Sequence, residues 1–228
     1  MFLDRRTEQA ESFDADMSPE EAGAAHGELG RLNALFKFSH PFVLRLPRMI
    51  PPDRCKTLSF LDVGAGDGSL GRRLTAWASN RGWKWTVTNL DLRPCVRNDA
   101  RRAVHVAGSA VSLPFADGAF DVVVASQMTH HLDSDAEIAA HFREGWRVAR
   151  TALLLSDLHR NAGLYYLLWV TTLLVGASPT IRADALASVR RAFRLGEWRH
   201  LASLAGIPNA KVWLYAGTRI MLEARKSP

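Results

Sequence analysis

The segment Phe60–Leu70 limits the possible folds more than any other part of the chain. Its sequence, FLDVGAGDGSL, carries an apolar run directly into three glycines at alternate positions, Gly64, Gly66 and Gly68. Glycine adopts left-handed backbone easily and lets a ligand approach closely, because it has no Cβ. A buried strand that ends in such a turn before a helix is typical of α/β domains that bind nucleotides.

The residues around this turn indicate a ligand without phosphate. A dinucleotide fingerprint, G-x-G-x-x-G, would need a glycine where Ser69 stands, and the Gly-Lys-Ser/Thr of a P-loop is absent. Asp62 and Asp67 flank the glycines, and two carboxylates would repel a pyrophosphate. We therefore expect a ligand that carries positive charge.

A further carboxylate, Asp91, ends the next apolar run, where an acid accepts hydrogen bonds from ribose hydroxyls in related nucleotide sites. A glycine turn, an acidic lining and a ribose acceptor together fit S-adenosylmethionine. That molecule has an adenosine, a cationic amino group and a sulfonium, and it has no phosphate. We predict it as the cofactor.

The rest of the chain alternates between strand and helix patterns. Short apolar runs predict strands, amphipathic runs predict helices, and a strand, Gly217 and another strand are expected within Lys211–Glu223. Parallel strands need crossovers, and these helices cover both faces of the sheet. The predicted fold is α/β, a doubly wound (Rossmann-like), mostly parallel sheet with an N-terminal helical extension. The strands are expected at 57–63, 83–90, 103–107, 120–126 and 151–156, and the helices at 70–80 and 136–148.

The motifs resemble those of the class I S-adenosylmethionine-dependent methyltransferases over about residues 58–157. The acid and three glycines of 62–68, the acid Asp91 and the segment LPFADGAFD at 113–121 are similar to that family. This last segment and His130-His131-Leu132 look most like the ubiquinone/menaquinone-biosynthesis type. The flanks 31–33, 156–160 and 188–193 are similar to bacterial members associated with type III polyketide synthases, which act on phenolic or quinone-like lipids.

The resemblance implies a set of cofactor contacts. Many relatives carry Asp where this chain has Ser109, which implies that the hydrogen bond to the adenine amino group is either weaker or supplied by another group. Gln127 is expected either to line the methionine end or to satisfy the end of its strand. The implied contacts are Asp62, Gly64, Ala65, Gly66 and Gly68 for methionine and ribose, Asp91 and Leu92 for ribose and adenine, Gly108, Ser109 and Ala110 for the adenine rim, and Ser126 and Gln127 after the fourth strand.

Three histidines are candidate catalytic residues. Methyl transfer from a sulfonium needs alignment, and it needs a base where the acceptor carries a proton. Ligands of open parallel sheets lie at the carboxyl ends of the strands, and His130, His131 and His159 follow such ends. His131 has the alternative of holding the loop through backbone bonds. Asp157 is expected either to orient a histidine or, somewhat more readily, to cap the next helix.

Other acceptors and a metal are not indicated. Enzymes that methylate DNA amino groups place Pro-Pro-Tyr/Phe after the fourth strand, where this chain has SQMT at 126–129. Metal-dependent catechol enzymes carry Asp-Asp/Asn after the fifth strand, whereas Asp157 precedes Leu158. Cys55 and Cys95 lack the CxxC spacing of a zinc site. We expect no metal and no nucleic-acid partner.

The run 162–177 is apolar around nearly its whole circumference, so a helix there is buried, covers a hydrophobic pocket or touches lipid. It is shorter than the ~20 residues that span a bilayer. The stretch 35–42 could close the other side of the site. Both features favour an apolar acceptor.

Residues 1–55 are assigned to an N-terminal helical extension that caps the substrate, with a helix from Ser18 to about Asn33, and 56–228 to the S-adenosylmethionine-binding methyltransferase domain. The net charge of +6 is scattered along the chain, and the N-terminus lacks an export signal. We expect a cytoplasmic, possibly membrane-associated protein that methylates a hydroxyl or ring carbon of a hydrophobic phenolic or quinone-like small molecule. An RNA or protein methyltransferase and a non-catalytic cofactor-binding subunit are the alternatives.

Overall fold

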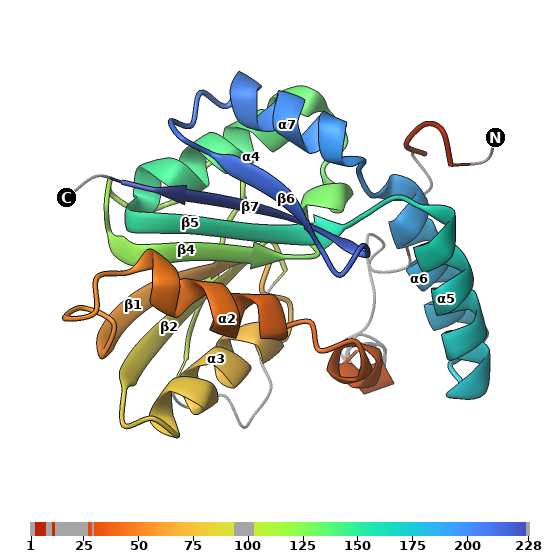
Figure 1. Cartoon of the computed structure of the whole chain (residues 1–228), viewed down its shortest axis with the longest axis horizontal. Coiled ribbons are helices and arrows are strands. Elements are labelled where there is room, and N and C mark those ends of the chain that lie inside the picture. Colours follow the sequence, from red (N-terminus) through yellow and green to blue (C-terminus); the bar gives the residue numbers. More distant parts are fainter. Residues whose placement is uncertain (1–2, 8–10, 12–26, 29, 94–102, 227–228) are drawn as a thin grey trace.

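The computed structural model describes residues 3–7, 11, 27–28, 30–93 and 103–226 (Figure 1). Across these residues seven strands form one sheet in the order β3-β2-β1-β4-β5-β7-β6. The first five are parallel, and β7 runs antiparallel to both of its neighbours. The strands are β1 Thr57–Val63, β2 Lys84–Asp91, β3 Val104–Ala107, β4 Phe120–Ser126, β5 Ala149–Leu158, β6 Lys211–Tyr215 and β7 Arg219–Arg225.

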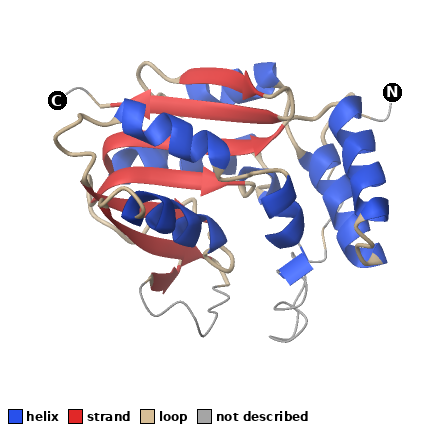
Figure 2. Ribbon diagram, turned by 60° about the horizontal axis from the view of Figure 1, so that its bottom comes forward, coloured by secondary structure: helices blue, strands red, loops and turns tan. Residues whose placement is uncertain are grey.

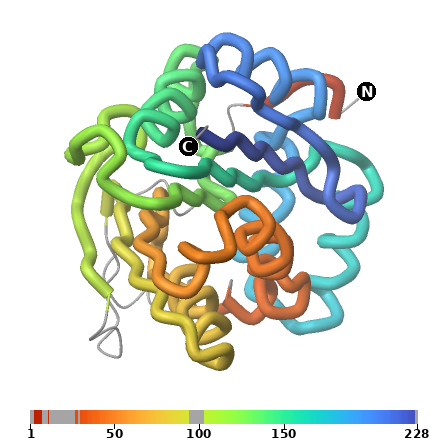
Figure 3. Tube along the Cα trace, turned by 60° about the vertical axis from the view of Figure 1, so that its left-hand side comes forward, coloured from red at the N-terminus to blue at the C-terminus, as the bar shows by residue number. Residues whose placement is uncertain are grey.

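Helices cover both faces of this sheet, as Figures 2 and 3 show. Helices α2 (His40–Met49) and α3 (Ser69–Ser79) lie on one face, and α4 (Asp135–Val148) and α7 (Leu195–Leu204) lie on the other. Side chains along a strand point alternately to the two faces. The central strands β4 and β5 are buried along most of their length because both faces are covered, and their middle residues 122–125 and 152–155 are all apolar.

The predicted doubly wound fold is confirmed. Each predicted strand overlaps an observed one, and the two predicted helices coincide with α3 and α4 within one residue. Ser134 and Glu137 form a capping box that fixes the start of α4. The predicted helix 18–33 lies largely outside the described residues, although residues 30–35 are helical.

Helices α5 (Ala162–Leu174) and α6 (Pro179–Arg191) pack against each other beyond the carboxyl ends of the parallel strands, at the right of Figure 1. Complete burial of the apolar run is therefore wrong, because only one side of α5 faces the protein. The buried positions of α5 are Leu164, Leu168 and Thr172, and the exposed ones include Tyr166, Leu167, Trp169, Val170, Leu173 and Leu174. Within the described residues, no helix is long and apolar enough to cross a membrane.

Candidate functional site

The glycine turn lies against the end of β2. Gly64, Gly66 and Gly68 have φ values of +68°, +54° and +74°, which favour glycine. A Cβ on Gly64 would lie 2.0 Å from Cγ of Met128, so no other residue fits there. The backbone N–H groups of Gly64 and Ala65 donate to the carbonyl of Leu90, at 2.8 and 3.1 Å. The turn is thus fixed to the strand that carries the second acid.

Asp91 joins the turn through its side chain. One carboxylate oxygen accepts a hydrogen bond from the Gly66 N–H at 2.8 Å, and the other accepts one from the Arg93 N–H at 3.0 Å. The following residue, Leu92, is 67% exposed at the end of β2. The structure therefore brings together the glycines and the acid predicted from the sequence. The Leu92 side chain, next in sequence after Asp91, is exposed to solvent.

Asp62 is a buried acid beneath this turn. It is 1% exposed, and its Oδ2 atom has no hydrogen-bond partner among the described residues. Burial, with repulsion from Asp91 and Asp67, raises the pKa of Asp62 to about 8, although a bond from the Gly71 backbone opposes this. A cationic ligand group at the turn would relieve that cost. The residues therefore fit the cofactor predicted from the sequence.

The three residues implied for the adenine rim follow β3. The Gly108 N–H donates to the Asp91 carbonyl at 2.9 Å, which places the rim beside the ribose acid. The Ser109 hydroxyl accepts a hydrogen bond from the Val111 N–H at 3.3 Å. Ser109, like its neighbour Ala110, is partly exposed. The Ser109 hydroxyl therefore accepts a hydrogen bond within its own turn.

The end of β4 meets the N-terminal stretch and β7. Gln127 has a φ of +55°, and its side-chain amide donates to Asn33 at 3.3 Å. Arg219 of β7 donates to the Ser126 hydroxyl at 3.2 Å and to the Phe38 carbonyl at 2.6 Å. Burial lowers the pKa of Arg219 to about 9. No sequence motif pointed to Arg219, because only the sheet order places β7 next to β5.

His130 is held rigidly by Asp157. The His130 Nδ1 atom lies 2.6 Å from Oδ1 of Asp157, and the His130 backbone N–H donates to Oδ2 at 3.0 Å. Both side chains are buried. Burial disfavours the charged imidazole, but the attraction of Asp157 and of Glu11 outweighs it and raises the pKa of His130. The helix-cap interpretation of Asp157 is wrong, because Asn161 caps α5 by accepting from the Leu164 N–H at 2.9 Å.

The three candidate histidines divide between two places. His131 stacks on His130 with ring centroids 4.4 Å apart, in the short 3-10 helix η2 (Thr129–His131). His159 instead has Nδ1 3.0 Å from the Gly217 carbonyl and lines a cavity of about 520 Å³ at the N-termini of α5 and α7. The structure thus groups His130 with His131 and leaves His159 apart from them.

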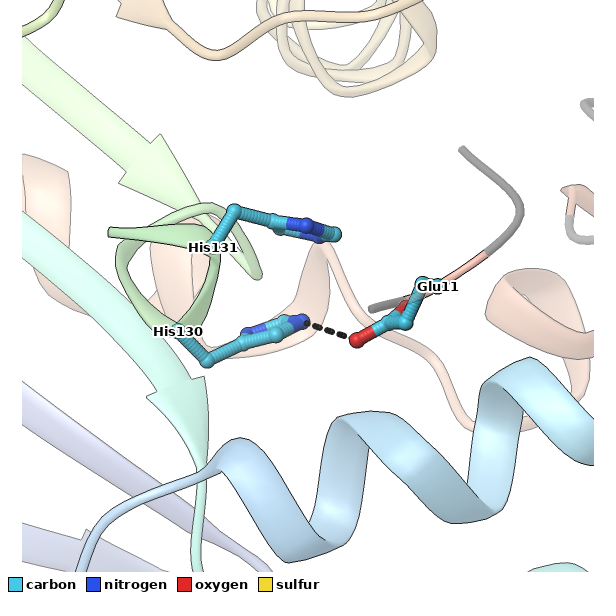
Figure 4. A group of neighbouring side chains, drawn as sticks. All are labelled: Glu11, His130 and His131. Atoms are coloured by element: carbon cyan, nitrogen blue, oxygen red, sulfur yellow. Dashed lines mark ion pairs between the residues drawn. The ribbon is translucent and has the colours of Figure 1, made fainter. Parts of the chain in front are cut away.

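Two residues missed by the sequence analysis complete the surroundings of His130. Glu11, in the N-terminal segment, has Oε1 3.6 Å from His130 Nε2 (Figure 4). Arg191, at the end of α6, donates to the carbonyls of His130 at 3.0 Å and His131 at 3.1 Å. Arg191 lies within the segment 188–193, whose resemblance to known methyltransferases was the one sequence feature that could have indicated it. No sequence feature indicated Glu11.

Part of the chain is similar in sequence to known methyltransferases. Residues 61–152 match the family model of a methyltransferase domain. The chain is 40% identical over 102 residues to a demethylmenaquinone methyltransferase of Roseiflexus sp. strain RS-1, a match that covers 43% of this chain and 41% of the relative. It is 27% identical over 132 residues to the mitochondrial ubiquinone biosynthesis O-methyltransferase of Saccharomyces cerevisiae, covering 54% of this chain and 40% of that protein. The matches thus span about two fifths of these relatives.

Solved structures share the fold over most of the chain. A methyltransferase of Aquifex aeolicus described as SAM-dependent aligns with a TM-score of 0.61 and 17% identity, covering 92% of this chain and 99% of that one. The plantazolicin methyltransferase BpumL, solved with SAH, aligns with a TM-score of 0.66 and 11% identity, covering 92% and 91%. Residues 61–152 are thus similar to a methyltransferase domain, and the chain shares its fold with solved S-adenosylmethionine-dependent methyltransferases.

Proposed function

We propose that this protein transfers a methyl group from S-adenosylmethionine to a hydroxyl or ring carbon of a hydrophobic phenolic or quinone-like small molecule. The observation that carries the proposal is the position of α5 and the stretch 33–38. Both lie at the carboxyl edge of the sheet, where the glycine turn also lies, and both present apolar side chains there. Ligands of open parallel sheets bind at this edge.

Bound S-adenosylmethionine supplies a methyl group activated by a sulfonium. Asp62 and the turn 64–68 would hold its methionine and ribose part, and Asp62 would accept the cationic amino group. Asp91 and Leu92 would hold the ribose and adenine, with the residues 108–110 at the rim. Ser126 and Gln127, at the end of β4, would lie toward the methionine end.

The acceptor class rests on apolar surface and on the named relatives. Phe36 and Phe38 pack against the small core that α5 and α6 share, so the N-terminal stretch and α5 lie on the same side of the molecule. Two relatives are named for menaquinone and ubiquinone biosynthesis, which supports a quinone-like acceptor. The exposed face of α5 also supports peripheral contact with lipid, in which such an acceptor would dissolve.

The polar residues available to an acceptor hydroxyl are the histidines. His130 and His131 lie at the end of β4, on the edge where the ligand is expected. His159 follows β5 and lines the cavity at the N-termini of α5 and α7, away from the other two histidines. All three remain candidate catalytic residues, and Asp157 is the positioning residue for His130.

Calorimetry and a product assay test this function. The purified protein should bind S-adenosylmethionine and S-adenosylhomocysteine, and it should add one methyl mass to a demethylated naphthoquinol or to members of a phenol panel, measured by mass spectrometry. Absence of binding heat would refute the assignment of the cofactor site. Binding without product from any acceptor would instead support the non-catalytic subunit.

A further inference from the structure

Three side chains that could hold a metal ion converge at the end of β4. Glu11 comes from the N-terminal segment, and His130 and His131 come from η2 (Figure 4). We propose that they form a binding site for a divalent transition-metal ion of the Zn²⁺ type. No metal was expected from the sequence, because the cysteines lack a CxxC spacing and Asp157 precedes Leu158. Glu11 is far from the histidines in sequence, so no motif linked the three residues.

The distance between Glu11 and His130 suits two ligands of one ion better than a direct hydrogen bond. One ligand atom from each residue lies within 4.8 Å of the other two. Glu11 Oε1 and His130 Nε2 are 3.6 Å apart. A hydrogen bond between such atoms would be about 2.7–3.2 Å long. Two ligands at about 2.0–2.1 Å from a tetrahedral Zn²⁺ are ~3.4 Å apart, which is close to the observed distance.

The surrounding residues orient two of the three ligands. Asp157 lies 2.6 Å from Nδ1 of His130, which places the proton there and leaves the lone pair of Nε2 toward Glu11. The Ser188 hydroxyl donates to Oε2 of Glu11 at 2.7 Å, and Oε1 of the same carboxylate faces His130. A carboxylate behind a histidine is the usual arrangement in zinc sites. Asp157 and Ser188 would therefore support the ligands without touching the ion.

The three ligands differ in burial. Glu11 and His130 are 5% and 2% exposed, whereas His131 is partly exposed. Three protein ligands are the number found in catalytic zinc sites, where water or substrate takes the fourth position. In the proposed methyl transfer, which this step assumes, an acceptor hydroxyl at that position would lose its proton to solvent more easily. Its oxygen would then bond to the methyl carbon as the sulfonium–methyl bond breaks and S-adenosylhomocysteine leaves.

Metal binding can be measured without any activity assay. Tag-free protein is stripped with a chelator and then titrated with Zn²⁺ by calorimetry and with Co²⁺ by visible absorption. We expect one equivalent of each, with the absorption bands of tetrahedral Co²⁺. Glu11→Gln and His130→Ala should each lower the affinity at least tenfold, and Asp157→Asn should lower it about 10- to 100-fold.

His200→Gln is the matched control, because His200 is an exposed histidine on α7. It should bind both ions like the unchanged protein. If His130→Ala does not fold, as judged by circular dichroism, Glu11→Gln and His131→Asn decide the matter. Substoichiometric binding, or binding that is equally tight in Glu11→Gln, would overturn the proposal.

A parallel titration with S-adenosylhomocysteine separates this proposal from the function proposed above. If the unchanged protein binds S-adenosylhomocysteine but no metal ion, only the metal-site proposal is wrong. If it binds the metal ion but no S-adenosylhomocysteine, the proposed methyltransferase function is wrong and the metal site is supported.

Discussion

Replacing Asp62 with asparagine should stabilise the cofactor-free protein near neutral pH and weaken cofactor binding. Asp62 is buried beneath the glycine turn, and its Oδ2 atom has no hydrogen-bond partner among the described residues. Asparagine has nearly the same shape and can still accept the bond from the Gly71 backbone. The substitution therefore removes the ionisable group and leaves the packing unchanged.

The expected size follows from the pKa of Asp62, which the fold raises from 3.8 to about 8. The unfolded chain releases this proton above pH 3.8, whereas the folded protein keeps it up to about pH 8. The stability of the unchanged protein therefore falls as the pH rises through this window. At pH 7 the full effect would be about 4 kcal/mol, and we expect about 1–3 kcal/mol because the new amide is also buried.

The assay is urea unfolding at pH 4.5, 6 and 7.5 without cofactor, followed by calorimetry with S-adenosylmethionine. The stability advantage of Asp62→Asn should grow with pH. In a separate thermal unfolding experiment at pH 7.5, its midpoint temperature should be higher by about 2–4 °C per kcal/mol. Affinity for the cofactor should fall about 10- to 150-fold, which corresponds to loss of a charge-assisted bond of about 1.5–3 kcal/mol.

Asp121→Asn is the matched control. Burial would raise the pKa of Asp121, but hydrogen bonds from Ser59 and the charge of Arg150 lower it overall, so its charge stabilises the folded state. Removing that charge should destabilise the protein above pH 4 and leave cofactor binding unchanged. If Asp62→Asn proved no more stable than the unchanged protein at pH 7.5, or bound cofactor equally well, the role given to Asp62 would be wrong.

Three further substitutions test other parts of the structure. Burial lowers the pKa of His141 to about 4, so the protein should lose stability as the pH falls from about 6.5 toward 4, and His141→Gln should flatten this loss in urea unfolding at pH 7.5 and 5. Gly64→Ala should abolish cofactor binding in calorimetry, because the new Cβ would collide with the side chain of Met128. Gly82 has a similar φ but open space around it, so Gly82→Ala should keep cofactor binding and lower the stability of the folded protein by about 1–3 kcal/mol. Equal cofactor binding by the two variants would contradict this. Leu174→Glu on α5 should reduce sedimentation with lipid vesicles, and Leu204→Glu on α7, exposed elsewhere, should not; no difference between them would exclude lipid contact through α5.

The cofactor side of the site could be predicted because its parts are local in sequence. The apolar run, the glycines 64–68 and the helix that follows are continuous, so neighbouring residues are enough to predict each of them. Asp91 required one further inference, namely that adjacent parallel strands end at the same edge. The hydrogen bond from the Gly66 N–H to Asp91 shows that this inference holds in the folded chain.

The acceptor side depended on contacts between distant residues. Arg219 reaches Ser126 because β7 runs antiparallel between β5 and β6, and no periodic pattern specifies that order. Glu11 meets His130 although the two residues are far apart in sequence. The exposure of α5 was equally hidden, since a helix apolar on all sides carries no pattern that says which side is covered. Short-range patterns fix elements and turns, whereas these pairings depend on packing between surfaces that form only after the elements exist.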